Sequence, residues 1–322
     1  AINREGTMLE NIVFLTTMLS LTAILGSSLL IFICMSLSSK LRTSVDIVFS
    51  QVILSTMMVT TVNWTYRSYL TSRRESREST AVCLLISLFG MAGYIVVLVS
   101  YLLVAIMQLV IVKKGIQTFN KVFTRRVACA MSVVIWLLSA VTGGFIVVGN
   151  HGNGATYVYN PMQKNCGSKV LGSASFTKSI ALSTAVWTFA CLAATCICYV
   201  VIILTLRFQM KITQRPNHSS SGQNYSKHQL SSKTRQQLVK TVKRIIALMM
   251  VYMLALLPVG IITGLIVRSC TDGLRIYMHI ARIFSLIGVA VFFPVYIISH
   301  RLHRKACYLL LSGRYKDIKY II

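Results

Sequence analysis

Two side chains in this sequence stand out because their chemistry does not suit the apolar stretch around them. Arg282 lies about two turns into that stretch, and His279 precedes it by three residues, so a helix would place both on one face. Charged residues inside apolar spans are rare and usually functional. We therefore expect His279 and Arg282 to bind an anionic group on a ligand. The alternative is that the Arg282 side chain extends to the nearby aqueous boundary.

No set of residues suited to catalysis accompanies them. All seven acidic residues lie between apolar stretches or at their ends. They are Glu5, Glu10, Asp46, Glu75, Glu78, Asp272 and Asp317. An intramembrane protease or a proton-coupled pump needs carboxylates at mid-membrane. The sequence therefore predicts neither an enzyme nor such a transporter, and no buried Asp to hold an amine.

The nine cysteines divide by position. Six lie in apolar stretches or in the amphipathic segment near the C-terminus: Cys34, Cys129, Cys191, Cys196, Cys198 and Cys307. Buried Cys usually packs as a small hydrophobic side chain, and no Cys or His spacing suits zinc, so we expect no metal and no cofactor. The other three, Cys83, Cys166 and Cys270, fall at one face of the apolar stretches. If that face is the oxidising exterior, a disulfide can form there.

These residues are carried by seven apolar stretches of membrane-spanning length. Hydrophobic residues make up 55% of the chain and charged residues 12%, against about 25% charged in soluble domains. A span needs about 20 apolar residues. The stretches are 11–36, 45–64, 82–112, 127–148, 179–206, 245–267 and 276–299. The fold we predict is an all-α membrane protein, a seven-transmembrane helix bundle with a C-terminal amphipathic helix.

The basic residues predict how the chain is oriented. The net charge is +26, and 22 of the 33 Lys and Arg residues lie on one side of the apolar stretches. Basic loops stay in the cytoplasm, so we expect a multi-pass plasma-membrane protein with its N-terminus outside. Because the basic residues alternate with apolar stretches, their partner is membrane lipid and not nucleic acid.

The chain reads as one transmembrane domain. Residues 1–10 form a short outer tail, and 208–237 form a flexible cytoplasmic loop rich in Ser, Gln, Asn and Lys. Residues 300–312 predict an amphipathic helix on the inner leaflet, followed by a cytoplasmic tail at 313–322. We expect palmitoylation of Cys307 within that helix. The alternative is that Cys307 is a buried small residue.

Over nearly its whole length the sequence resembles the rhodopsin-like (class A) G-protein-coupled receptors. Cys83 and Cys166 resemble the disulfide that joins the third helix to the second outer loop in that family. The segment from Arg301 resembles its eighth helix. Single residues in four other helices also match: Trp136, Tyr199, Pro258 and Pro294.

The sequence departs from the family at several motifs. Met107-Gln108-Leu109 replaces the Asp-Arg-Tyr triplet, so the usual arginine latch on the G protein is absent. Thr56 stands for the second-helix Asp, so we expect no sodium pocket. Tyr296 comes one place early in the Asn-Pro-x-x-Tyr motif, and Ser27 and Cys191 replace a first-helix Asn and a fifth-helix Pro.

The resemblance implies a receptor that binds a small organic ligand, here expected to be anionic, and activates a heterotrimeric G protein. The ligand-contacting residues it implies are Met91, Tyr94, Ser183, Trp187, Thr263, His279 and Arg282. The residues it implies for the G-protein face are Gln108, Lys113, Arg126, Tyr199 and Lys240. For each of them, simple packing is the alternative.

Within the family, segment 46–54 is similar to the second helix of fish-type odorant receptors, which favours an odorant or chemosensory role. One alternative is a seven-helix decoy or scaffold without G-protein output, which the missing triplet favours. A bitter-taste-type receptor is another, since those also lack the triplet. A transporter or channel is disfavoured by the absence of internal repeats and of mid-membrane carboxylates.

Overall fold

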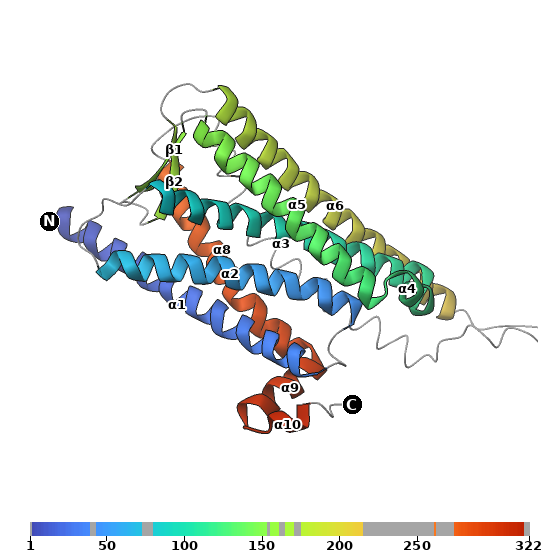
Figure 1. The fold of residues 1–322 in the computed structure, drawn as a ribbon. Helices are drawn as coiled ribbons and strands as arrows, with labels where there is room; N and C mark the ends of the chain where they lie inside the picture. Colours follow the sequence, from blue (N-terminus) through green and yellow to red (C-terminus); the bar gives the residue numbers. More distant parts are fainter. Residues whose placement is uncertain are drawn as a thin grey trace, which may run out of the picture.

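The structure, a computed structural model, describes residues 2–38, 43–72, 80–152, 155–160, 165–170, 175–214, 261 and 274–318. Figure 1 shows a bundle of long helices with a small β-hairpin at one end. The long helices are α1 (Ile2–Leu37), α2 (Ser44–Ser72), α3 (Thr80–Lys114), α5 (Arg125–Gly152), α6 (Ser175–Gln214) and α8 (Leu274–Ser299). The short elements are α4 (Ile116–Val122), β1 (Ala155–Asn160), β2 (Asn165–Val170), α9 (Arg301–Leu311) and α10 (Tyr315–Ile318).

Among the described residues, α1, α2, α3, α5 and α6 are each long and apolar enough to cross a membrane. The part of α8 from Leu286 to Ile298, taken together with α9, adds a sixth candidate span that bends by 94° between the two helices. The predicted helical membrane fold is therefore confirmed. The predicted stretch 245–267 lies outside the described residues except for Ile261.

Several helices continue past the apolar stretches that predicted them. Helix α1 begins at Ile2, so the segment expected as an outer tail is helical. Helix α6 runs to Gln214, the last residue described in that part of the chain, and so extends into the segment predicted as a loop. An apolar stretch predicts only the part of a helix that contacts lipid. The backbone hydrogen bonds of the helix can continue beyond that part, because they do not depend on apolar side chains.

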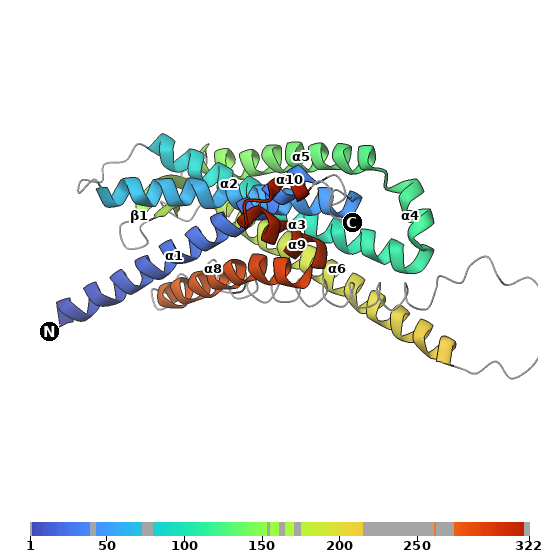
Figure 2. The ribbon, with the colours of Figure 1, turned by 90° about the horizontal axis from the view of Figure 1, so that it is seen from below.

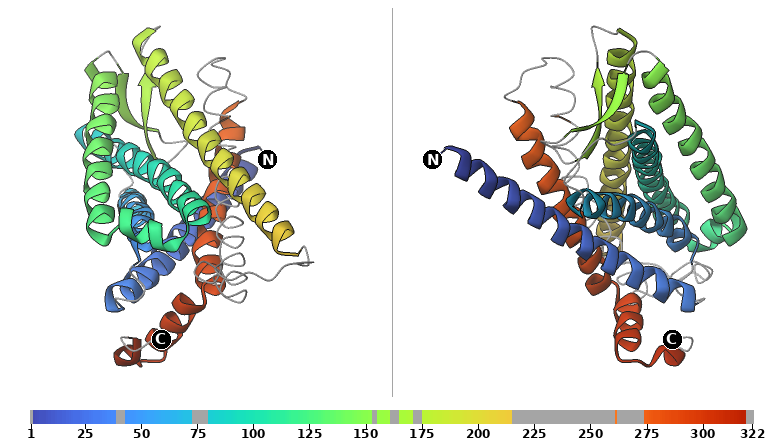
Figure 3. Two further views of the ribbon diagram at one scale, coloured as in Figure 1. Left: turned by 90° about the vertical axis from the view of Figure 1, so that its right-hand side faces the viewer. Right: turned by 60° about the vertical axis from the view of Figure 1, so that its left-hand side comes forward.

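The two strands pair antiparallel, with Tyr159 opposite Cys166. This hairpin packs against the start of α3, at the end of the bundle opposite α4 and α9 (Figures 1 and 3). The two ends are called the hairpin end and the α9 end below. The hairpin occupies a segment predicted only as a loop, although its first strand is rich in β-branched and aromatic residues.

Helix α3 lies against α2 on one side and α5 on the other, and small residues allow both approaches. A Cβ atom added to Gly93 would lie 2.5 Å from Val59 Cγ2, a side chain of α2. A Cβ atom added to Gly143 of α5 would lie 3.0 Å from the backbone nitrogen of Ala92. In a membrane, where apolar burial does not hold helices together, such close packing is a main source of stability.

Polar side chains join the same three helices. The Ser55 hydroxyl donates to the Gly93 carbonyl at 2.8 Å. The Gln51 amide donates to the Ser132 hydroxyl of α5, and the Ser100 hydroxyl of α3 donates to the Gln51 carbonyl oxygen at 3.5 Å. The helices that surround α3 are therefore tied to it by hydrogen bonds as well as by shape.

The amphipathic helix predicted over 300–312 is present as α9, and the segment after it differs from the predicted tail. Gly313 adopts a left-handed φ of 75° and ends α9 with two backbone hydrogen bonds, Gly313 N to Leu310 O at 3.1 Å and Arg314 N to Leu309 O at 2.9 Å. The turn directs α10 back toward α1, where the Ile318 side chain is fully buried. Burial of this apolar side chain holds α10 beside α1.

Candidate functional site

The hairpin-end half of the bundle brings together two of the predicted ligand-contacting residues. The Tyr94 hydroxyl of α3 donates to the Thr188 hydroxyl of α6 at 3.4 Å, and the Tyr94 ring packs against Leu98 and Leu192. Met91 lies one turn earlier, against the pair formed by Cys83 and Val147. A half-buried phenol with a neighbouring hydroxyl can both stack on a ligand and form hydrogen bonds with it.

The residue of α6 that contacts Tyr94 is Thr188, which was not among the predicted ligand-contacting residues. Trp187 is 55% exposed and Ser183 is also exposed, whereas Thr188 is 5% exposed. One residue along a helix turns the side chain by about 100°. The inward face of α6 continues from Thr188 through Cys191 and Thr195, all buried. The sequence could not fix this face, because α6 is apolar on nearly all sides.

Of the other predicted ligand-contacting residues, two have only a described backbone position and one lies outside the described residues. Helix α8 carries His279 and Arg282 on successive turns, three residues apart, although the positions of their side chains are not described. Thr263 lies outside the described residues. The proposed anionic-ligand pair therefore belongs to a continuous helix that lines the bundle from the hairpin end.

Cys83 lies in the first turn of α3, at the hairpin end. It is 1% exposed and belongs to a disulfide. Helix α3 is in contact with β2, the strand that carries Cys166. A cross-link at this position would fix the hairpin over the end of the bundle.

At the α9 end, Gln108 occupies a buried position on α3. The side chain is 3% exposed, and neither its amide nitrogen nor its amide oxygen has a hydrogen-bond partner among the described residues. The hydroxyl of Tyr199 on α6, at 2% exposure, also lacks one within that part of the chain. Leaving a buried polar group unpaired costs about 1–3 kcal/mol, so these groups are unusual enough to be functional candidates.

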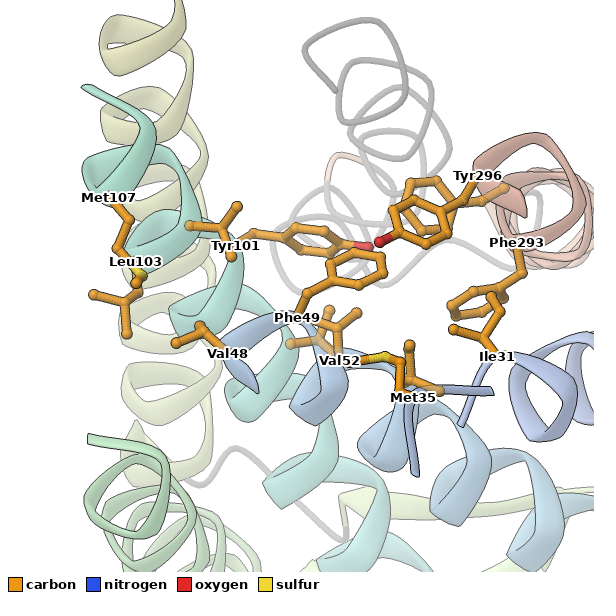
Figure 4. Packing of buried hydrophobic residues seen from close by; sticks show 14 of the residues in the cluster. Ile31, Met35, Val48, Phe49, Val52, Tyr101, Leu103, Met107, Phe293 and Tyr296 are labelled. Atoms are coloured by element: carbon orange, nitrogen blue, oxygen red, sulfur yellow. The ribbon is translucent and has the colours of Figure 1, made fainter. Parts of the chain in front are cut away.

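A buried aromatic cluster lies about two turns before Gln108 along α3, at Tyr101, and was not predicted as a functional site. Phe49 of α2 stacks on Tyr296 of α8 with ring centroids 4.6 Å apart, and Tyr101 of α3 meets Phe292 edge-on at 6.3 Å. Figure 4 shows the hydroxyl groups of Tyr101 and Tyr296 pointing toward one another. The cluster joins α2, α3 and α8.

A sequence signal for this cluster exists in α3. Tyr94, Tyr101 and Gln108 recur every seven residues, which in a helix is close to two turns and places them on one face. Tyr94 meets α6, Tyr101 meets α8, and Gln108 is buried near the α9 end. The face therefore runs from the candidate ligand region to the opposite end of the bundle.

Helix α9 is held under this cluster by a buried histidine. His303 is 2% exposed, its ring lies 5.2 Å from that of Tyr296, and neither ring nitrogen has a hydrogen-bond partner among the described residues. Burial, with the neighbouring His300, lowers the pKa of His303 to about 4. The imidazole is therefore neutral near pH 7.

The predicted palmitoylation residue, Cys307, is buried in the structure. It is 3% exposed, and its sulfur lies 3.5 Å from the sulfur of Cys34 on α1. An acyl chain on Cys307 would require the thiol to move away from Cys34.

Among the residues predicted to face a G protein, Lys113 and Arg126 are exposed, and Lys240 lies outside the described residues.

Comparison with known proteins adds the family assignment. The family model described as 7 transmembrane receptor (rhodopsin family) matches residues 26–291, well over half of the chain. The matched segment includes residues 245–267, the predicted span that lies outside the described residues except for Ile261. A comparison with curated proteins finds no match.

Proposed function

Because the chain belongs to the rhodopsin family of seven-transmembrane receptors, we propose that it is a chemosensory receptor, of odorant type, for a small organic ligand. The family is one of G-protein-coupled receptors, and the chain is a multi-pass membrane protein. The ligand class, the coupling and the location in the cell are our proposals.

One observation carries the proposal: the continuous face of α3 formed by Tyr94, Tyr101 and Gln108. At one end it meets α6 through the bond to Thr188, and in the middle it meets α8 at Phe292. A ligand that moves Tyr94 would displace a helix that packs on both neighbours. Packed helices have discrete arrangements, so such a displacement can reach the other end of the bundle.

The ligand is an anionic small molecule held near His279 and Arg282. Helix α8 brings both residues toward the hairpin end on one face. Arginine binds carboxylates through two parallel hydrogen bonds. Affinity for a carboxylate ligand should fall at least tenfold in Arg282→Ala, because a charge-assisted pair contributes about 1.5–3 kcal/mol.

Arg275→Ala is the matched control, since Arg275 lies on the same helix two turns closer to its start. The assay is equilibrium binding of a radiolabelled carboxylate ligand to membranes, with surface expression measured in parallel. Equal affinity in both variants would rule out the anionic-ligand part of the proposal. The receptor proposal itself would then rest on neutral ligands.

The proposed orientation puts the hairpin end outside the cell and the α9 end in the cytoplasm, in the plasma membrane. The excess of Lys and Arg around Lys113, Arg126 and α9 supports it. On this orientation Cys83 and Cys166 face the oxidising exterior, and we propose that they form the disulfide. The disulfide state of Cys83 and the contact between α3 and β2 support that pairing.

A second candidate function is a seven-helix decoy or scaffold that binds a ligand without G-protein output. Burial of an uncharged Gln108, where the family has an arginine, favours it. A bitter-taste-type receptor remains a third. Ligand-dependent nucleotide exchange on a G protein separates the decoy from both receptor types, and the identity of the active ligand separates odorant from bitter-taste receptors.

A further inference from the structure

The short helix α4 forms a fixed corner between the ends of α3 and α5 (Figure 2). Gly115 has a φ of 82°, a conformation that glycine adopts without strain, and it turns the chain from α3 into α4. The Phe119 side chain is 4% exposed and stacks on Phe123 with centroids 5.1 Å apart. The Ser44 hydroxyl donates to the Phe123 carbonyl at 2.6 Å. Side chains on the outer surface of this corner are therefore held in place.

That outer surface is strongly basic. Five exposed cations lie on it: Lys113, Lys114, Lys121, Arg125 and Arg126. The sequence contains no Asp or Glu between Glu78 and Asp272. No described residue forms an ion pair with Lys113, Lys114, Lys121 or Arg126. The segment of the chain that forms the corner therefore supplies no carboxylate to balance them.

An exposed apolar face begins directly beside these cations. Ala130, Val133, Leu137 and Val141 follow Arg126 at intervals of four, seven, eleven and fifteen residues, which places all of them on its face of α5. All four are exposed; Leu137 is 62% exposed and Val141 71%. The face therefore continues from a charged corner to an apolar strip along the span.

We propose that this corner is a binding site for an anionic phospholipid. The headgroup phosphate lies between Lys121 and Arg126, and one acyl chain lies along the exposed face of α5. The site is independent of the proposed ligand, and it shares Arg126 with the predicted G-protein face.

The apolar strip decides between a lipid and other anions. The cations alone would also suit a free phosphate or an acidic protein surface. A free phosphate gains nothing from Val133 or Leu137, and an acidic protein would have to enter the hydrocarbon region to reach them. Only an amphiphile with an anionic head covers both parts, and anionic lipid attracts each nearby Lys or Arg by about 1 kcal/mol.

The test is native mass spectrometry of the full chain, purified in detergent and incubated with phosphatidylserine or with phosphatidylcholine of the same acyl chains. The variant is Lys121→Gln with Arg126→Gln. The control, Arg207→Gln with Lys316→Gln, removes two other exposed cations and the same net charge. Soluble phosphoserine serves as a headgroup without acyl chains, and thermal unfolding checks that all proteins remain folded.

We expect phosphatidylserine to bind more tightly than phosphatidylcholine, and the Lys121 and Arg126 double variant to lower that affinity about 30-fold. The control variant should retain it. Equal binding of the two lipids, or equal losses in both double variants, would overturn the proposal. Competition by soluble phosphoserine at the affinity of the whole lipid would also overturn it, since the site would then be a phosphate site.

Discussion

The contact between α2 and α3 gives the sharpest test of the packing. A Cβ atom added to Gly93 would meet side chains of α2, whereas a Cβ atom added to Gly90, one turn earlier on α3, would have no atom within 4 Å. Alanine at Gly90 should be neutral or stabilising by up to about 1 kcal/mol, the usual difference in helix propensity. Alanine at Gly93 places a methyl group 2.5 Å from Val59 Cγ2 and 3.0 Å from Ser55 Oγ.

The magnitude follows from that geometry. Carbon atoms pack best at about 3.5–4.0 Å, so a separation of 2.5 Å requires a shift of about 1 Å. Val59 cannot rotate away easily, because a helical valine has one preferred rotamer. Overpacking costs about 1–3 kcal/mol, and movement of α3 would also strain the 2.8 Å bond from Ser55 to the Gly93 carbonyl. Gly93→Ala should be less stable than Gly90→Ala by about 1–3 kcal/mol.

Thermal unfolding in detergent, followed with a thiol-reactive dye, measures the difference. Cys34, Cys191 and Cys307 are buried and react on unfolding, whereas exposed Cys129 sets the baseline. Each kcal/mol corresponds to roughly 2–4 °C for a protein near this size. If Gly93→Ala melts at or above the temperature of Gly90→Ala, the close approach of α2 and α3 is wrong.

Three further predictions concern buried polar groups and the cross-link. His303 has a pKa of about 4 in the folded protein against an ordinary 6.5. The unfolded chain therefore takes up the proton first as the pH falls, and the free energy of unfolding should drop by up to about 3 kcal/mol between pH 6.5 and pH 4. His303→Phe should remove that pH dependence of the melting temperature. Gln108→Leu should raise stability by about 1–3 kcal/mol by removing an unpaired buried amide, and a lower melting temperature would show that the amide has a partner. Cys83→Ser and Cys166→Ser should each lower stability by about 2–4 kcal/mol, with no further loss in the double variant; additive losses would argue against the pairing.

The spans could be predicted because lipid imposes a simple requirement. A helix must offer about 20 apolar residues to cross the bilayer, and the stretches 82–112 and 127–148 fall within α3 and α5. Helix ends were harder to predict. Outside the membrane the ladder continues until a residue interrupts it, as Gly313 does at the end of α9.

The inward faces of the helices could not be predicted from the sequence in the same way. In a membrane both the lipid-facing and the buried side chains are apolar, so no polar face marks the outside. Trp187 and Thr188 differ by one position, and only the neighbouring α3 decides which of them meets Tyr94. Ile318 was missed for a related reason, since one apolar residue in a basic tail becomes significant only when α1 is beside it.

G-protein activation tests the central claim most directly. The chain is expressed at the cell surface with a panel of odorants, bile acids and other small acids, and nucleotide exchange on heterotrimeric G proteins is measured for the unaltered chain and for Gln108→Arg. The account predicts exchange that depends on at least one ligand and that is weakened by Arg282→Ala. If no ligand increases nucleotide exchange, either for the unaltered chain or for Gln108→Arg, although both are at the cell surface, the receptor proposal is contradicted. A seven-helix decoy or scaffold would then be favoured.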